Sequence, residues 1–438
     1  MSGSQKPARR YELDWLRSFA VLGLIPFHAA IIFTTGSRDY VKNEQTSYMM
    51  DMLTSFITFW GIPLIFLVSG AAARYALLVR TPARYMYERV TRLVIPFLFA
   101  MVSVVPLQVY IGHLSDPGPR EPFLSFYAGF IQSLLAIFTG VLPERGPEWI
   151  GHLWFIPPLM LFAFAAVPLS RLLATDRGKR FLAALANLGG GFGLLLLFGL
   201  VPGLLLLITQ LGLAEISWLP DQITGSAIGF IQYLVYFLYG YILYADSRFL
   251  TTLRRHAWNS LMLGLAAWVT YLVVTRTGHA PESALTPRYA LFTLIRGYIS
   301  WWWVIGILGF GIRYLGFTTK GLRYVSTATY PVYIIHMPIL SFLAYLIVQT
   351  EVGIWLKFAL ITCATLAVSL LVYELIISRV PVLRVLFGLH PKGTRAPGGT
   401  GTTRTAVTPG TEMPTGQSKT LPSAPSGTSS VPRVPHPL

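Results

Sequence analysis

The chain has 438 residues, 54% of them hydrophobic and 12% charged, with a formal net charge of +16. Several apolar runs reach the roughly 20 residues that a helix needs to cross a bilayer, which excludes a soluble protein. The Lys and Arg residues lie in short loops between these runs, so the charge indicates membrane topology rather than a nucleic-acid partner. The single cysteine, Cys363, excludes a disulfide within the chain.

The first predicted span covers about residues 18–35. It follows the basic residues Lys6, Arg9 and Arg10, which place the N-terminus in the cytoplasm. The apolar run contains His28 and lacks a small-residue cleavage site, so we predict a retained span rather than a signal peptide.

The apolar runs that follow alternate with basic loops in a consistent order. We therefore predict an all-α, polytopic membrane protein with about ten transmembrane helices and both termini in the cytoplasm. The predicted spans are about residues 18–35, 48–73, 93–111, 152–169, 188–209, 226–244, 257–275, 289–312, 328–349 and 353–377.

Two other segments complete the predicted organisation. Residues 123–142 contain several polar side chains, and the charges of the neighbouring loops favour an interfacial or re-entrant helix on the outer side. Residues 391–438 consist mainly of Thr, Gly, Pro and Ser and are predicted to be a disordered cytoplasmic tail. The chain thus divides into a cytoplasmic segment 1–10, a transmembrane domain 11–390 and this tail.

Arg17 and His28 are the first candidate functional residues. Their spacing of eleven residues is about three helical turns, so both side chains fall on one helix face, roughly 16 Å apart. Ionisable groups inside a span usually face a bundle interior or a cavity. The pair therefore predicts a polar track, although His28 would also fit as a core histidine bonded to a neighbouring carbonyl group.

Arg89 and Arg92 lie in the basic loop before the third span, three residues apart and hence on one helix face. Two guanidinium groups on one face suit a phosphate or diphosphate, because each donates in a bidentate fork. Membrane topology also explains the excess of charge in this loop, so both interpretations stay open.

Other motifs place polar residues at or inside the membrane. GHLWFIPP carries His152 and Trp154 at the outer end of the fourth span, and TYPVYIIH carries Tyr333 and His336 in the ninth. Arg296 lies inside the eighth span. An interfacial Trp and a packed aromatic face are the simpler explanations for the first two motifs. Two histidines and an arginine inside the membrane nevertheless exceed what packing requires.

Together these motifs resemble the membrane-bound acyltransferase type 3 family. The family carries an Arg, ten residues and a His in its first span, matched by Arg17 and His28, and an Arg-x-x-Arg pair, matched by Arg89 and Arg92. The blocks LDWLR, FLVSG, HLWF and YPVYIIH occur in the family's order. Within the family, LGLIPFHAA and the ending YELIISRVPVLRVLFGLHPKG are most similar to members that succinylate glucans.

The resemblance implies an acyltransferase of the inner (plasma) membrane. It would move a succinyl or acetyl group from cytoplasmic acyl-CoA to a hydroxyl of a periplasmic glucan or another cell-envelope glycan. No permanently bound cofactor, no metal and no nucleic acid is expected. The expected CoA-binding residues are Arg17, Arg89 and Arg92. The expected catalytic residues are His28, Arg296 and His336, and the expected substrate-binding residues are His152, Trp154 and Tyr333.

His28 fits two chemical roles. Its apolar surroundings favour the neutral imidazole, which as a general base takes the proton of the attacking hydroxyl. Alternatively, it accepts the acyl group itself in a two-step relay. Arg296, at a similar predicted depth, would stabilise the oxyanion or pair with a succinyl carboxylate, unless it forms a structural ion pair or reaches the outer headgroups.

Two other functions fit the same residues. A secondary transporter would line a path for a proton and an anionic solute with His28, Arg296 and His336. The lack of a visible repeat and the position of the Arg pair at one face favour the enzyme. A family member that acylates a lipid or peptidoglycan would share the mechanism and differ in its outer vestibule.

Overall fold

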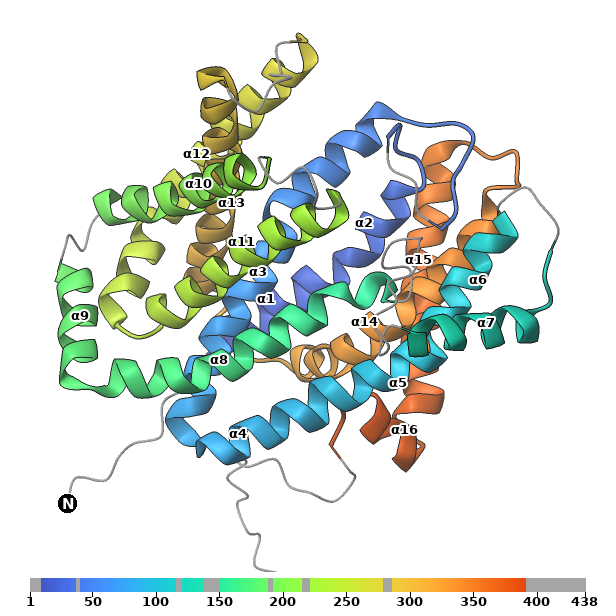
Figure 1. Ribbon diagram of the computed structural model, residues 1–438, viewed down its shortest axis with the longest axis horizontal. Helices are drawn as coiled ribbons and strands as arrows, with labels where there is room; N and C mark the ends of the chain where they lie inside the picture. Colours follow the sequence, from blue (N-terminus) through green and yellow to red (C-terminus); the bar gives the residue numbers. More distant parts are fainter. Residues whose placement is uncertain are drawn as a thin grey trace, which may run out of the picture. The chain divides into compact units, whose positions relative to one another are not determined.

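The computed structural model describes residues 9–36, 40–115, 120–136, 150–187, 192–214, 221–278 and 286–390, and the regular elements in these ranges are all helical (Figure 1). The first are α1 (Tyr11–Leu22), α2 (Leu24–Ile31), α3 (Tyr48–Val79), α4 (Pro82–Arg89), α5 (Ile95–Ser103), α6 (Val105–Ser115) and α7 (Phe123–Ala136). They are followed by α8 (Ile156–Ala174), α9 (Asp176–Asn187), α10 (Phe192–Ala214), α11 (Asp221–Leu243), α12 (Ser247–Arg276), α13 (Pro287–Tyr314), α14 (Lys320–Ile347), α15 (Ile354–Val372) and α16 (Pro381–Leu386). The π-helical turns η1 (Val90–Val94) and η5 (Tyr373–Ile377) and the 3-10 helix η4 (Gly151–Phe155) adjoin these helices.

This architecture confirms the predicted fold class, an all-α polytopic membrane protein. Within the described ranges, seven helical stretches are long and apolar enough to cross a membrane: Tyr48–Val79, Pro82–Ser115, Gly151–Ala174, Ser247–Arg276, Pro287–Tyr314, Lys320–Ile347 and Ile354–Ile377. The other predicted spans coincide with α1 followed by α2, with α10 and with α11, so ten crossings stay a prediction. The predicted tail, residues 391–438, lies outside the described residues.

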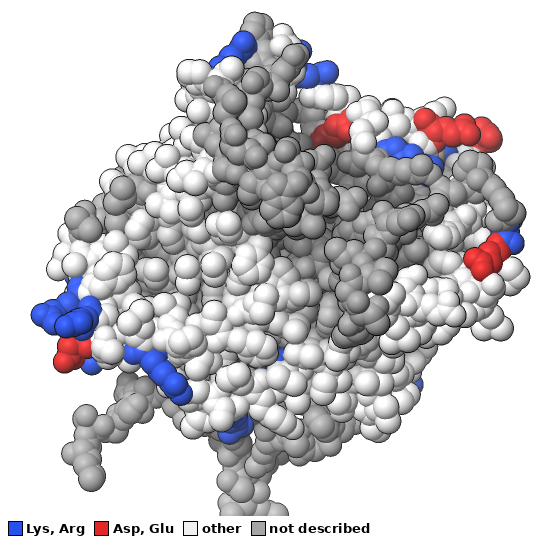
Figure 2. Space-filling model, in the orientation of Figure 1, with Lys and Arg blue, Asp and Glu red and all other residues white. Residues whose placement is uncertain are grey.

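The outer surface of the helices suits a lipid environment. On the face drawn in Figure 2, charged side chains gather toward the two ends of the described helices, and uncharged residues fill most of the band between them. Large apolar side chains are exposed on several helices, among them Leu196, Trp258 and Leu371. α4 and α16 lie at one end of the helices, and the connection between α2 and α3 lies at the other (Figure 1).

The predicted interfacial segment 123–142 contains α7, which ends at Ala136, and residues 137–142 lie outside the described residues. Fourteen helical residues extend about 21 Å, which is shorter than the ~30 Å hydrocarbon core. α7 packs on α6, where the Phe126 ring lies 5.3 Å from that of Tyr110. The described part of this segment is therefore too short to cross by itself, and the interfacial position of residues 123–142 stays a prediction.

The first predicted span is two helices rather than one. α1 ends at Leu22 and α2 begins at Leu24, with Gly23 between them. Pro26 lacks the N–H that would bond the Leu22 carbonyl, so the helical ladder is interrupted there. Helical pairing resumes at once, because the Phe27 N–H donates to the Gly23 carbonyl at 3.2 Å.

α3 and α11 approach each other closely at two glycines. A Cβ atom added to Gly70 of α3 would lie 1.9 Å from the Phe237 carbonyl oxygen, and one added to Gly240 of α11 would lie 1.8 Å from the Leu67 carbonyl oxygen. A side chain at either position would clash with the partner backbone, so small residues are required here. This contact fixes the part of α3 that carries Ser69, one of the residues that line the cavity described below.

α14 packs against α1, α2, α6 and α15 and so lies at the centre of one half of the bundle. It contains Pro331 and Pro338. Because proline has no N–H, the carbonyl groups four residues earlier, those of Thr327 and Ile334, have no helical donor. The Ile334 carbonyl is therefore available to a side chain from another element.

Candidate functional site

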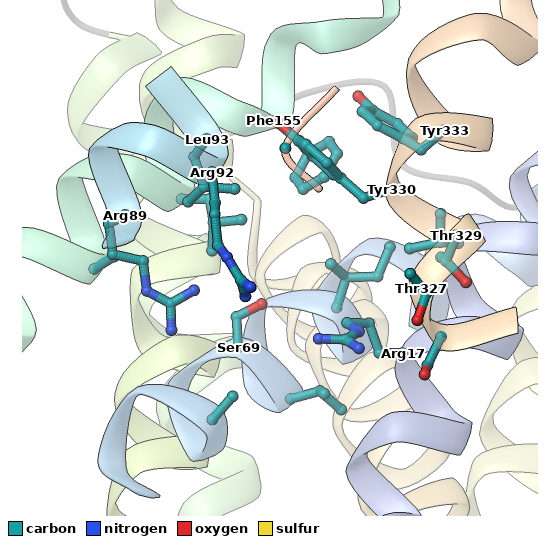
Figure 3. Close-up of a pocket in the computed structure, with 18 of the residues that line it drawn as sticks. Arg17, Ser69, Arg89, Arg92, Leu93, Phe155, Thr327, Thr329, Tyr330 and Tyr333 are labelled. Atoms are coloured by element: carbon teal, nitrogen blue, oxygen red, sulfur yellow. The ribbon is translucent and has the colours of Figure 1, made fainter. Parts of the chain in front are cut away.

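A cavity of about 350 Å³ lies among α1, α3, α4, η1, α8 and α14 (Figure 3). Its basic lining residues are Arg9, Arg17, Arg89, Arg92 and His390. Its hydroxyl-bearing and aromatic lining residues include Ser69, Thr327, Thr329, Phe155, Tyr330 and Tyr333. The cavity is therefore basic where the arginines lie and apolar where Phe155 and Tyr333 lie.

Three guanidinium groups point into the cavity from opposite sides. Arg89 and Arg92 approach from one side and Arg17 from the other, with the Ser69 side chain between them (Figure 3). The predicted donor-binding arginines therefore share one cavity, although the sequence separates Arg17 from the other two. Guanidinium forks and hydroxyl donors directed at one volume are suited to phosphate oxygens.

The cavity holds an excess of positive charge. Asp14 accepts from Arg9 at 2.8 Å and lies 3.4 Å from Arg17, and no acidic residue lines the cavity among the described residues. Outside the cavity, Glu88 pairs with Arg80 at 3.2 Å and with Arg84 at 3.3 Å. The acidic residue of the basic loop is thus engaged by arginines that do not line the cavity.

The local backbone at Arg89 and Arg92 departs from a regular α-helix. α4 ends at Arg89, and the π-helical turn η1 begins at the next residue and contains Arg92. The Arg89 guanidinium lies 4.9 Å from the centroid of the Tyr85 ring, a cation–π distance. Single π turns inside helices are frequent at functional sites.

Tyr333 and Phe155 form the apolar end of the cavity, with ring centroids 4.9 Å apart. Tyr333 is buried, and its hydroxyl donates to the His152 carbonyl oxygen at 2.6 Å. Its ring centroid lies 5.5 Å from that of His152 and 5.7 Å from that of His336. The Tyr333 side chain therefore lies between the cavity and these histidines.

Three histidines from distant parts of the chain form a cluster beyond Tyr333. The ring centroids of His28 and His336 lie 5.7 Å apart, and those of His152 and His336 lie 5.2 Å apart. His152 and His336 are buried, and His28 is half-buried. The structure thus brings together residues of α2, η4 and α14 that the sequence motifs singled out separately.

The imidazole of His152 is fixed by α14. Its Nε2 lies 3.2 Å from the Tyr333 carbonyl oxygen and 3.1 Å from that of Ile334, so Nε2 carries a proton and donates. Ile334 is the carbonyl that Pro338 leaves without a helical donor. The proline in α14 therefore creates the acceptor that orients a histidine from another element.

Gln108 of α6 engages the other ring nitrogen of His152. The His152 Nδ1 lies 2.6 Å from Gln108 Oε1, and Gln108 Nε2 lies 2.9 Å from the Tyr40 hydroxyl. If the amide is turned so that its NH2 faces Nδ1, the imidazole is neutral, and the opposite orientation requires imidazolium. Gly151 has φ +52°, and a Cβ there would lie 2.1 Å from the Gln108 amide nitrogen, so only glycine fits.

His336 is held in one tautomer by its own helix. Its Nδ1 lies 2.6 Å from the Tyr333 carbonyl oxygen, so Nδ1–H donates and the lone pair of the neutral ring is on Nε2. This is the form that accepts a proton. Among the described residues, no group of three or more His, Cys, Asp or Glu could hold a metal ion.

Two predicted site residues lie elsewhere. Trp154 is 41% exposed and packs against Tyr233 with ring centroids 5.8 Å apart. Arg296 is on α13, next to Gly297, where a Cβ would lie 2.4 Å from the Gly203 backbone of α10. Neither residue lines the cavity or makes a ring contact with the described histidines.

The sequence motifs assigned no role to several residues of the site. Gln108 lies inside an apolar span with no motif around it, and Thr327 is an ordinary helix residue. Ser69 and His390 lie within the blocks FLVSG and YELIISRVPVLRVLFGLHPKG, but neither was predicted as a site residue. Pro338 does indicate one feature of the site in advance. A proline inside a helix leaves the carbonyl four residues earlier without a helical donor, and here that carbonyl belongs to Ile334.

Comparison with known proteins gives concordant results. The family model described as an acyltransferase domain (Acyl_transf_3) matches residues 10–374. The chain is 24% identical over 398 residues to glucans biosynthesis protein C of Escherichia coli (strain K12), covering 88% of this chain and 96% of that protein. It is 25% identical over 407 residues to the protein of the same name from Salmonella typhimurium (strain LT2), covering 89% and 97%. No solved structure matches.

Proposed function

Because the chain belongs to the acyltransferase family whose domain model covers residues 10–374, we propose that it transfers a succinyl or acetyl group from cytoplasmic acyl-CoA to a hydroxyl of a periplasmic glucan or another cell-envelope glycan. The enzyme class follows from the family, and the donor, the acceptor and the acyl group are the proposed parts. The name of the bacterial relatives, glucans biosynthesis protein C, supports a glucan acceptor, and their bacterial origin supports an inner-membrane location.

The observation that carries the donor is the convergence of Arg17, Arg89 and Arg92 in one cavity whose far end is formed by Tyr333. Acyl-CoA has a diphosphate at one end of a long pantetheine arm and the thioester at the other. The arginines would bind the diphosphate through charge-assisted hydrogen bonds. The apolar end would receive the arm and direct the thioester toward the histidine cluster past Tyr333.

The reaction needs a base on the acceptor side of that cluster. A neutral His28 would take the proton from the attacking hydroxyl while the acyl–oxygen bond forms and the acyl–sulfur bond breaks. The thiolate of CoA leaves and accepts this proton from the His28 imidazolium, so charge and atoms balance. Alternatively, His28 would receive the acyl group first, with release of the CoA thiolate, and would pass it to the hydroxyl in a second step in which the hydroxyl proton goes to that thiolate. His336, 5.7 Å from His28 between ring centroids, would assist either route.

A transfer assay tests this function. The full chain, reconstituted in lipid vesicles with a linear glucan on one side, is given radiolabelled succinyl-CoA or acetyl-CoA on the other side, and labelled glucan is measured. We expect wild-type label transfer and its loss in His28→Ala. His113→Ala is the matched control, because His113 is an exposed histidine outside the cluster and should leave transfer unchanged.

Each outcome decides one part of the proposal. No transfer by the wild-type protein from either donor to any glycan hydroxyl would contradict the donor and acceptor assignment. Transfer by His28→Ala above a few per cent of the wild-type rate would contradict the role of His28. Uptake of an anionic solute without any CoA release would instead support a transporter.

A further inference from the structure

Part of the cavity wall comes from a segment that follows the last long helix. The family model ends at residue 374, but Gly388, Leu389 and His390 line the cavity. They directly follow the short helix α16 and belong to the segment 381–390, which we call the C-terminal wall. α16 lies at the same end of the bundle as α4 (Figure 1).

The C-terminal wall packs against α5 and against the backbone of Arg92 in η1. Phe387 is buried, and its ring lies 5.5 Å from that of Phe99 in α5. Gly388 has φ +74°, and a Cβ there would lie 2.9 Å from the Arg92 carbonyl oxygen and 2.9 Å from the Tyr330 ring. A left-handed backbone in so narrow a space requires glycine. The wall therefore meets the backbone of Arg92 itself.

Arg384 holds the end of this wall. Its guanidinium donates to the His390 carbonyl oxygen from Nη2 at 2.8 Å and from Nε at 3.1 Å, and to the Ser378 carbonyl oxygen from Nη1 at 3.0 Å. These bonds place the backbone of His390 at a defined position, with its exposed imidazole among the residues that line the cavity.

The electrostatic surroundings of His390 are dominated by cations. Burial, followed by the positive charge of Arg92, lowers the pKa of the His390 imidazole, with Arg80 and Arg384 acting in the same direction and Glu88 opposing them. Near neutral pH the empty cavity therefore favours neutral His390. An anion bound among these groups reverses the balance, because it stabilises the imidazolium.

We propose that the C-terminal wall is part of the donor site and that His390, as imidazolium, binds the 3′-phosphate of acyl-CoA at the mouth of the cavity. The order of groups along CoA assigns this phosphate: the thioester enters the end at Tyr333, the diphosphate meets Arg89 and Arg92, and the ribose 3′-phosphate is farthest from the sulfur. His390 lines the cavity and has Arg80 and Glu88, two loop residues outside the cavity, among its charged neighbours, which favours a position toward the mouth. The inference rests on the proposed function, because it takes acyl-CoA as the donor.

Equilibrium binding of CoA and of 3′-dephospho-CoA to the full chain in lipid nanodiscs tests this proposal. At pH 6, we expect His390→Gln to weaken CoA binding by about three- to tenfold, the scale of one charge-assisted contact at an exposed position. The same variant should bind 3′-dephospho-CoA as the wild type does. His113 is an exposed histidine in the last turn of α6, far from His390 in the sequence. His113→Gln should therefore change neither affinity.

The effect should also depend on pH with a definite sign. Phosphate binding raises the pKa of His390 above its value in the empty cavity, so its contribution is complete at pH below the empty-cavity pKa and disappears as pH rises through the bound pKa. The ratio of wild-type to His390→Gln affinity for CoA should therefore fall from pH 6 to pH 8.5. The second ionisation of the phosphate, with a pKa near 6, is nearly complete above pH 7. The fall of the ratio between pH 7 and 8.5 therefore reports the deprotonation of His390.

The outcomes separate this inference from the function on which it rests. Equal CoA affinity of wild type and His390→Gln at pH 6 would overturn it, and so would an equal loss for CoA and 3′-dephospho-CoA. In either case the donor assignment stands as long as the wild-type protein binds CoA. A wild-type protein that binds neither ligand would overturn the donor assignment and this inference together.

Discussion

Protein groups engage both ring nitrogens of His152. A ring held in this way has no nitrogen to offer an acceptor hydroxyl without losing a hydrogen bond. Its position 5.2 Å from His336 between ring centroids favours a positioning role over the acceptor binding that the sequence predicts. Gln108, which contacts the His152 Nδ1, would then affect the reaction indirectly, by orienting the imidazole of His152.

Gln108→Leu tests this positioning role. We expect kcat for acyl transfer to fall by about 10–100-fold, because a small displacement of the histidine cluster is enough for such a loss. The Kd for CoA should not change, since Gln108 does not line the cavity. Gln108→Glu keeps a polar partner for Nδ1 and should shift the pH profile of kcat, which a loss of packing alone would not do. A wild-type kcat in Gln108→Leu would contradict the assignment.

Arg296 is the residue whose predicted role has the least structural support. Its side chain is half-buried on α13, outside the cavity lining and the histidine contacts. If its guanidinium binds the carboxylate of a succinyl group, Arg296→Gln should lose succinyl transfer and keep acetyl transfer, as measured with the two labelled donors. Loss of both would indicate oxyanion stabilisation. An unchanged succinyl rate in a normally inserted variant would leave a structural role.

At the scale of elements, α14 shows how a backbone defect contributes to a site. Pro338 leaves the Ile334 carbonyl without a helical donor, and the imidazole of His152 takes that place at 3.1 Å. Pro338→Ala would restore the N–H, which would compete with His152 for the same oxygen. Because alanine is the better helix former by about 3 kcal/mol, the variant should not lower thermal stability.

The expected result of Pro338→Ala is therefore an unusual combination, an unchanged or higher Tm together with a reduced kcat. Thermal unfolding in detergent and the transfer assay measure the two quantities. Pro63→Ala in α3 is the matched control for removing a helical proline. A parallel fall of Tm and kcat would indicate general destabilisation and would contradict the specific role of the Ile334 carbonyl.

The first span illustrates what helical periodicity predicts and what it misses. The spacing of Arg17 and His28 predicts one continuous polar face, but the chain breaks its helix at Gly23, before Pro26. Arg17 lines the cavity, and His28 belongs to the histidine cluster beyond Tyr333. The two residues therefore belong to different parts of the site, the cavity and the histidine cluster. Tyr333 of α14 separates these parts, so the sequence of the first span alone does not predict the division.

For the whole molecule, hydropathy and loop charge were sufficient for the fold class, because lipid leaves helices as the available structure for long apolar runs. Short motifs singled out the site residues one at a time: His28 in the first span, His152 in GHLWFIPP, and Tyr333 and His336 in TYPVYIIH. The pairing of α2, η4 and α14 was not predictable from periodicity, since it depends on which helices pack together. Gln108 and His390 become visible as site residues only through those contacts.

Arg89 and Arg92 connect the site to the orientation of the whole chain. They count toward the positive charge that is predicted to keep their loop in the cytoplasm, and they line the cavity proposed to bind CoA. Replacing both with Lys keeps the charge and removes the guanidinium forks. We expect orientation to be unchanged, as measured by the accessibility of introduced cysteines in the loops, and the Kd for acyl-CoA to rise by about tenfold or more.

Arg80→Lys with Arg84→Lys is the matched control, because these arginines belong to the same loop but pair with Glu88 outside the cavity. This double variant should keep both orientation and acyl-CoA affinity. If the Arg89 and Arg92 variant bound acyl-CoA as tightly as wild type, the two residues would act only through their charge on topology. If the control lost affinity equally, the loop's total charge rather than the geometry of the cavity would attract the donor. Only a loss confined to the cavity pair supports bidentate recognition of phosphate, because both variants carry the same charge.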